Sequence, residues 1–274
     1  MKDILIDTIL DSIKLLPFLF VAFYIIELFE HKFAKKTREA ITNSKKFGPI
    51  VGSFLGIIPQ CGFSVVATNL YVTRILSLGT LISVYLSTSD EMLPILISHN
   101  APPKDILTIL GVKVLIGTMM GFIIDLIIRK KDAQEFSICE SDKCDCEESL
   151  IKSTLIHTIK TFLFIFLITL VLNILMSYLS EEILTKIFMT NSIFAPFLSC
   201  LIGLIPNCAP SVLITELYLS GVIKIGTCIA GLLTNSGLAL IVLFKTNDNI
   251  KENIIILTLI YIVGVISGII INLI

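Results

Sequence analysis

Charged residues are scarce in this chain of 274 residues: they make up 16% of it, against 55% hydrophobic residues and a mean hydropathy of +0.93. So little polar surface cannot cover a water-soluble globule of this size. The composition therefore predicts an integral membrane protein, and the lipid bilayer is its first expected partner.

Several motifs that would indicate other functions are also absent. Without a Gly-x-x-x-x-Gly-Lys-Ser/Thr loop or a nucleotide-binding domain, the chain is not expected to use ATP by itself. Neither His-Glu-x-x-His nor Gly-x-Ser-x-Gly occurs, so we predict no enzyme and no bound cofactor. No basic and aromatic tract suggests nucleic acid. No basic leader precedes the first apolar run, so no secretory signal is expected.

An internal duplication is the strongest positive feature. Residues 47–89 align without a gap to residues 194–236, an offset of 147, and 16 of the 43 positions are identical. Shared hydrophobicity could align Leu with Ile, but it would not keep Pro, Gly, Cys and Tyr in one register. The identical pairs include Pro59 with Pro206, Cys61 with Cys208, and Tyr71 with Tyr218.

Six apolar runs are long enough for a hydrocarbon core of about 30 Å, which needs roughly 20 residues as helix. They are residues 8–29, 75–97, 104–128, 153–178, 225–244 and 253–273. The runs 48–58 and 62–72 are too short to cross, and a Pro-Gln-Cys-Gly sequence separates them. The second copy repeats this pattern. We predict a re-entrant hairpin of two half-helices in each copy, because non-helical backbone at this depth must be packed in protein or line a wet cavity.

Positive charge predicts the orientation. The segment 30–46 carries six Lys or Arg residues, and residues 129–131 add three more, so both are placed in the cytoplasm. Three spans and one returning hairpin per copy then invert the second copy and put both termini outside. The predicted fold is all-α and polytopic, with about ten helical segments. Its parts are a first repeat (1–131), a cytoplasmic linker (132–152, or 129–152 with its basic start) and a second repeat (153–274).

Asp90 and Glu91 lie inside the second predicted span, among Ser, Thr and Pro residues. A charge at mid-membrane costs about 2.5–3.5 kcal/mol on insertion scales, so a cation or proton site is predicted there. The alternative is that the helix ends early and water reaches both acids. Glu216, in the second hairpin, is a further proton-coupling candidate, or it lies at the open end of that hairpin.

Cys61 and Cys208 occupy the two predicted hairpin tips. Thiolate favours soft ions, whereas the oxygens of neighbouring Gln, Asn, Ser and carboxylate groups favour harder ones. Inverted hairpins that met tip to tip would bring both sulfurs together. The alternative is that Cys serves as a small packing residue. The predicted substrate ligands are Cys61, Cys208, Asp90, Glu91, Gln60, Asn207, Ser64, Ser211, Ser89, Asn235 and Ser236.

The linker holds Cys139, Cys144 and Cys146 with five acids within ten residues. Such a tract can chelate a soft metal at the cytoplasmic entrance. A solvated acidic linker is the alternative reading. A disulfide framework is not expected, because the remaining cysteines lie in or beside apolar segments and cytoplasmic thiols stay reduced.

The motifs Gly56-Ile57-Ile58-Pro59-Gln60-Cys61-Gly62-Phe63-Ser64 and Ser87-Thr88-Ser89-Asp90-Glu91 resemble those of a ten-helix heavy-metal exporter family, also described as manganese transporters and related to arsenic efflux permeases. Gly203 to Ser211 resembles the second motif of that family. The resemblance covers nearly the whole chain and implies metal transport. The linker departs from the family in lacking His.

These features predict a secondary-active exporter of a divalent or heavy-metal ion in the cell membrane. Protons moving inward would drive it, and the inverted repeats would provide alternating access to a midplane site. An efflux permease for arsenite or organoarsenicals is one alternative, and a non-transporting redox or scaffold protein is another. The chain could also pair with a second copy as a homodimer.

Overall fold

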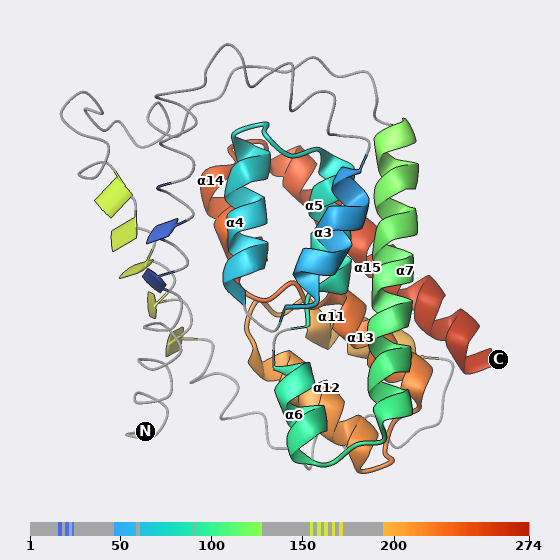
Figure 1. Cartoon of the computed structure of the whole chain (residues 1–274). Helices are drawn as coiled ribbons and strands as arrows, with labels where there is room; N and C mark the ends of the chain where they lie inside the picture. The colour runs from blue at the N-terminus through green and yellow to red at the C-terminus, as the bar shows by residue number, and fades with distance from the viewer. Residues whose placement is uncertain are drawn as a thin grey trace.

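The computed structural model describes residues 47–58, 61–89, 91–127 and 194–273, with isolated helical positions between 16 and 24 and between 154 and 171. Every regular element in these residues is a helix (Figure 1). The linker 132–152 and most of the predicted spans 8–29 and 153–178 lie outside the described residues.

The first set of helices comprises α3 (Gly48–Gly56), α4 (Cys61–Val72), α5 (Leu78–Ser87), α6 (Met92–Ser98) and α7 (Pro103–Ile127). Local sequence accounts for several of these limits. Pro49 stands in the first turn of α3, where no backbone donor is needed. The side chain of Ser77 caps α5 by accepting the amide of Thr80 at 3.1 Å. From the far end of α7, Asp125 accepts the amide of Gly79 at 2.8 Å instead of extending to the membrane surface.

The second set comprises α11 (Ala195–Gly203), α12 (Ala209–Leu219), α13 (Ile225–Thr234), α14 (Ala239–Thr246) and α15 (Ile250–Leu273). Four of these five helices begin 147 residues after their counterparts in the first set, and α12 begins one residue later still. The helix limits therefore follow the register found in the sequence.

The predicted spans 75–97 and 225–244 are each interrupted in the structure, although Ile225–Thr246 as a whole remains long and apolar enough to cross a membrane. Backbone between α5 and α6 and between α13 and α14 is not helical, so each predicted span is two shorter helices. The interruptions coincide with clusters of residues that favour turns: Thr88 and Ser89 in the first copy, and Asn235, Ser236 and Gly237 in the second. Gly237 has a φ of +58°, a conformation open to glycine without strain.

Glycines bring three helices together in each set. Gly117 and Gly121 of α7 face α5, and a Cβ added to Gly121 would lie 2.7 Å from the carbonyl oxygen of Gly79. In the second set, Gly264 and Gly268 of α15 face α13 at the same offset. Small residues at such interfaces let helix backbones approach closely, which is the usual basis of helix association in lipid.

The two interrupted helices form the core. Residues 79–89 and 226–243 are buried without exception. The half-helices then pack across the two sets, α4 against α14 and α6 against α12. Figure 1 shows the first pair in the upper half of the molecule and the second pair in the lower half. Each interruption thus lies where elements of both sets meet.

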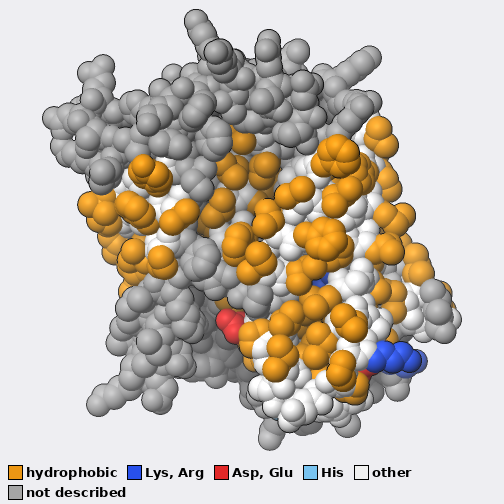
Figure 2. All heavy atoms as spheres, in the orientation of Figure 1, with side chains coloured by type: hydrophobic (Ala, Val, Ile, Leu, Met, Phe, Trp, Pro, Cys, Tyr) orange, Lys and Arg blue, Asp and Glu red, His pale blue; other side chains and the backbone are white. Residues whose placement is uncertain are grey.

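The outer surface suits lipid. Pro103–Ile127, Ile225–Thr246 and Ile250–Leu273 are long and apolar enough to cross a membrane, the second of them only when its interruption is included. Large hydrophobic side chains such as Phe54, Leu115 and Ile266 are exposed. Hydrophobic side chains spread over the face formed by α3 and α7, and few charged ones appear there (Figure 2). This surface is that of a polytopic membrane protein.

Candidate functional site

The first interruption is fixed by backbone and hydroxyl contacts. The amide of Ser89 donates to the carbonyl oxygen of Gly56 at 3.1 Å, which ties the interruption to the end of α3. The hydroxyl of Ser89 donates to the carbonyl oxygen of Ser87 at 3.0 Å. Thr88 and Ser89 are both buried, and Glu91 is half-buried where α6 begins. The described residues Thr88 and Ser89 therefore form a buried, polar stretch between α5 and α6.

The second interruption is polar without being charged. The side-chain oxygen of Asn235 accepts the amide of Gly237 at 2.9 Å, which closes a tight turn. Ser236 is buried, and its hydroxyl has no hydrogen-bond partner among the described residues. The oxygen of this hydroxyl is therefore available to an additional partner.

Lys113 connects the two interruptions. This residue of α7 is fully buried. Its ammonium donates to the carbonyl oxygen of Thr88, at the end of α5, and at 3.0 Å to that of Leu232, in the last turn of α13. The sequence suggested Asp90 or Glu91 as its partner; Asp90 lies outside the described residues. Carbonyls at a helix C-terminus carry negative partial charge, so they stabilise this buried cation.

Tyr85 links the two sets a turn away. It is fully buried in α5, and its hydroxyl shares a hydrogen bond of 2.6 Å with Thr68 of α4. The same hydroxyl donates to the carbonyl oxygen of Ala239, the first residue of α14, at 3.5 Å. Sequence analysis missed Tyr85, although a tyrosine in the middle of a predicted span is itself a signal of a buried polar partner.

The second tip, between α11 and α12, is turned by its own side chains. The side-chain oxygen of Asn207 accepts the amide of Cys208 at 2.7 Å, and the hydroxyl of Ser211 donates to the carbonyl oxygen of Cys208 at 2.8 Å. Asn207 and Ser211 are buried, and Cys208 is half-buried. Ser64, the counterpart of Ser211, is buried as well.

Other predicted ligands fall outside the described residues: Gln60, Asp90, the side chain of Cys61, and the linker thiols Cys139, Cys144 and Cys146. The proximity of the Cys61 and Cys208 sulfurs therefore stays a prediction. Glu216 is exposed on α12. Within the described residues, no three His, Cys, Asp or Glu side chains gather in a way that could hold a metal ion. Oxygen donors at the interruptions come instead from hydroxyl, amide and backbone groups.

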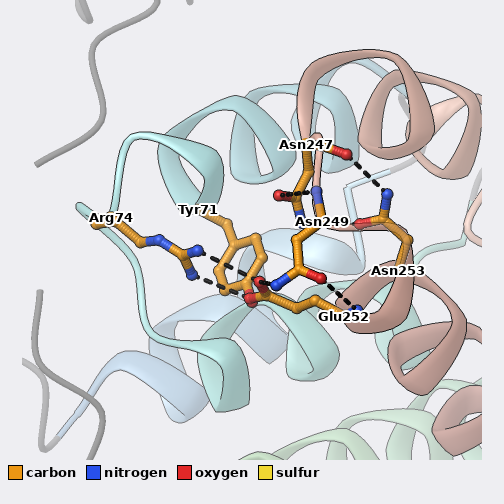
Figure 3. A network of polar contacts seen from close by, with 6 residues as sticks. All are labelled: Tyr71, Arg74, Asn247, Asn249, Glu252 and Asn253. Carbon is orange, nitrogen blue, oxygen red and sulfur yellow. Dashed lines mark hydrogen bonds and ion pairs between the residues drawn. The ribbon is translucent and has the colours of Figure 1, made fainter. Parts of the chain in front are cut away.

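A second polar cluster joins the two sets at one end of the molecule (Figure 3). The hydroxyl of Tyr71 of α4 donates a hydrogen bond to the carboxylate of Glu252 of α15. The two terminal guanidinium nitrogens of Arg74 donate to the same carboxylate at 3.0 and 3.3 Å. The amide of Glu252 donates to the side chain of Asn249 at 3.3 Å, so Asn249 caps α15. The hydrogen bond with Glu252 raises the pKa of Arg74.

A simpler contact occupies the equivalent place in the other copy. Tyr218 of α12, which corresponds to Tyr71, lies near the carboxylate of Asp105 of α7, which corresponds to Glu252. Gly221, with a φ of +74°, stands where Arg74 stands with a φ of +61°. These two end contacts, Tyr71–Arg74–Glu252 and Tyr218–Asp105, each join the two sets, and α4 and α12 lie at opposite ends of the molecule in Figure 1.

These features define a polytopic helical membrane protein whose two central helices are interrupted at polar, buried turns. Comparison with family models then identifies the family. Residues 1–182 and 170–246 match the family described as "Putative, 10TM heavy-metal exporter", and the chain belongs to it. No curated protein and no solved structure matches the chain.

Proposed function

We propose that this chain is a secondary-active exporter of a divalent heavy-metal ion, manganese or one of similar chemistry. The ion would bind between the two interruptions of the central helices. The observation that carries this proposal is the pair of interruptions, buried at corresponding positions and connected through Lys113. Interrupted helices buried at membrane depth, with free carbonyls and polar side chains, are a common way for secondary transporters to hold ions.

The expected ligands are mainly oxygens. Ser89, Asn235 and Ser236 are buried at the interruptions, and Asp90 and Glu91 would add negative charge. Hydroxyl, amide and carboxylate oxygens suit manganese better than a soft ion. Among the residues that the structure describes, the hydroxyl of Ser236 has no hydrogen-bond partner, so it is available to such an ion.

Arsenite is the second candidate substrate, and the tip thiols support it. Cys208 is half-buried at the end of the second hairpin, next to buried Asn207. If Cys61 lies beside it, as inverted hairpins would require, two thiolates could bind a soft ion that oxygens hold poorly. A substrate panel therefore needs both classes.

Alternating access is supported by the two end contacts. Tyr71–Arg74–Glu252 joins the sets at the end where α3 begins and α7 ends (Figure 1), which are the helix ends next to the basic segments 30–46 and 129–131. We assign this contact to the cytoplasmic entrance and Tyr218–Asp105 to the outer exit. Breaking one while keeping the other would expose the centre to one side at a time.

Protons moving inward are the proposed energy source. Asp90 and Glu91 would exchange protons for the metal, because one carboxylate cannot hold both cations at full strength. Glu216 is exposed on α12, and we assign it to proton entry and not to the buried ion site. The linker thiols Cys139, Cys144 and Cys146 would collect the ion at the cytoplasmic side.

Flux in proteoliposomes tests the proposal. The full chain would be tested with manganese, zinc, copper and arsenite, with and without a proton gradient, and with the variants Asp90→Asn and Cys61→Ser. We expect proton-dependent metal flux that Asp90→Asn reduces at least tenfold. Asp248→Asn, the same change at an exposed residue, is the matched control. No flux of any substrate in the wild type would refute the function; normal flux in both variants would refute the site.

A further inference from the structure

Lys113 is held at a place where many transporters would hold a metal cation. The carbonyl oxygen of Thr88 follows the last turn of α5, and that of Leu232 belongs to the last turn of α13. Carbonyls at the C-terminal ends of interrupted helices are ligands for sodium in secondary transporters. An ammonium group has the same charge as sodium or potassium and is held by the same kind of oxygen.

The second copy offers no such cation. The residue that corresponds to Lys113 in α15 is Ile260, which is also fully buried. One lysine therefore serves both interruptions, reaching across from the first set to a carbonyl of the second. Its backbone is held close to α5, because a Cβ at Gly117, one turn further along α7, would lie 3.0 Å from the carbonyl oxygen of Ser83.

We propose that the Lys113 ammonium is a built-in monovalent cation that holds the ends of α5 and α13 together. Transport by this chain would then need neither sodium nor potassium, a consequence that rests on the proposed function. Removing the lysine side chain would turn the two carbonyls into a site for a small external cation. Lys113 is in this sense a positioning residue, since it fixes the interruptions without being carried across the membrane.

The test compares the thermal stability of purified full-length variants in four chloride salts: choline, sodium, potassium and methylammonium. For Lys113→Ala we expect a Tm several degrees below wild type in choline, and a saturable recovery of at least half that loss in potassium or methylammonium. The controls are wild type and Lys104→Ala, the same change at an exposed lysine of α7. Each of these two proteins should have the same Tm in all four salts. Lys113→Arg should keep most of the stability without added cation.

A response of Lys113→Ala to the four salts that matches wild type would overturn the proposal. If Lys113→Ala does not fold in any salt, Lys113→Met, which keeps the side-chain volume, takes its place and must show the same recovery. Wild-type flux provides a second measurement: a requirement for sodium or potassium would also overturn it. The salt dependence of Tm does not depend on any metal being exported, so failure of the proposed function would be seen separately.

Discussion

Gly111 and Gly121 lie ten residues apart on α7. Gly111→Ala should raise the stability of the fold, and Gly121→Ala should lower it. Gly111 is exposed, and a Cβ there would meet nothing within 4 Å. Gly121 is buried, and its Cβ would lie 2.7 Å from the carbonyl oxygen of Gly79 and 2.8 Å from the Cβ of Pro49. Both neighbours are rigid, since one is helix backbone and the other is a proline ring.

The magnitudes follow from these distances. Alanine favours a helix over glycine by about 1 kcal/mol, and both variants gain this term. Carbon atoms in good contact are about 3.5–4.0 Å apart, so Gly121→Ala must push α7 away from α5 and α3 by several tenths of an ångström. Overpacking of this kind costs about 1–3 kcal/mol. The free energy of unfolding should therefore rise by up to about 1 kcal/mol in Gly111→Ala and fall by up to about 2 kcal/mol in Gly121→Ala.

Thermal unfolding of both variants in the same detergent measures the difference. For a chain of this size, 1 kcal/mol corresponds to about 2–4 °C in Tm, so the two midpoints should differ by several degrees. Gly268→Ala repeats the test in the second set, where the added Cβ would lie 2.5 Å from the Cβ of Ala230. Equal Tm values for Gly111→Ala and Gly121→Ala would show that α7 does not pack on α5 through glycine.

Three further predictions concern the polar contacts between the two sets. Glu252→Gln should destabilise the proposed cytoplasmic closure by about 1 kcal/mol, because the pair with Arg74 is partly exposed (side-chain exposures of 36% and 21%); faster modification of a cysteine introduced at Ser236 would report it, and an unchanged rate would contradict it. Arg74→Gly should destabilise less than Arg74→Ala by about 1 kcal/mol in thermal unfolding, because a φ of +61° strains alanine but not glycine; equal losses would refute the strain. Tyr85→Phe and Thr68→Val should each cost about 1 kcal/mol and the double variant less than the sum of the two, since both remove the hydrogen bond that the two hydroxyls share; additive losses would argue against that bond.

The limits of the short helices α3 and α4 could be predicted closely from the sequence. The runs 48–58 and 62–72 became α3 at Gly48–Gly56 and α4 at Cys61–Val72. Proline and glycine change the backbone only within one or two residues along the chain, so their effect on helix limits can be predicted from the local sequence. The repeat offset of 147 then carried the same limits into the second copy.

The interruptions of the central helices were missed for a physical reason. A window of about 20 residues averages hydropathy, so a four-residue polar turn inside a long apolar run barely lowers the mean. The local signals are present in Thr88-Ser89 and in Asn235-Ser236-Gly237, and an early helix end near Asp90 is predicted only as the alternative to a charge inside the span. Residue clusters that favour turns inside a predicted span should be read as breaks when they recur in both copies.

Contacts across the two sets could not be predicted. Tyr71 and Glu252 are 181 residues apart, and the helices between them must be placed before the pair can be recognised. Two of the partners of Lys113 are backbone carbonyls, which every residue possesses, so no residue type marks them. From the sequence alone, an acid is the expected partner of a buried lysine, because a sequence shows which side chains are charged but not where backbone carbonyls lie.

Charge breaks the correspondence between the two copies, and this asymmetry has a consequence for transport. In the second copy, Lys113 corresponds to Ile260, Arg74 to Gly221, and Glu91 to Leu238. Two identical inverted halves would make the inward-open and outward-open states mirror images of equal energy. When only one of the two end contacts contains an ion pair, that pair stabilises the state that is closed at its own end. In the orientation we propose, the Arg74–Glu252 pair favours closure toward the cytoplasm, so the empty exporter should rest open to the outside and need inward-moving protons to return.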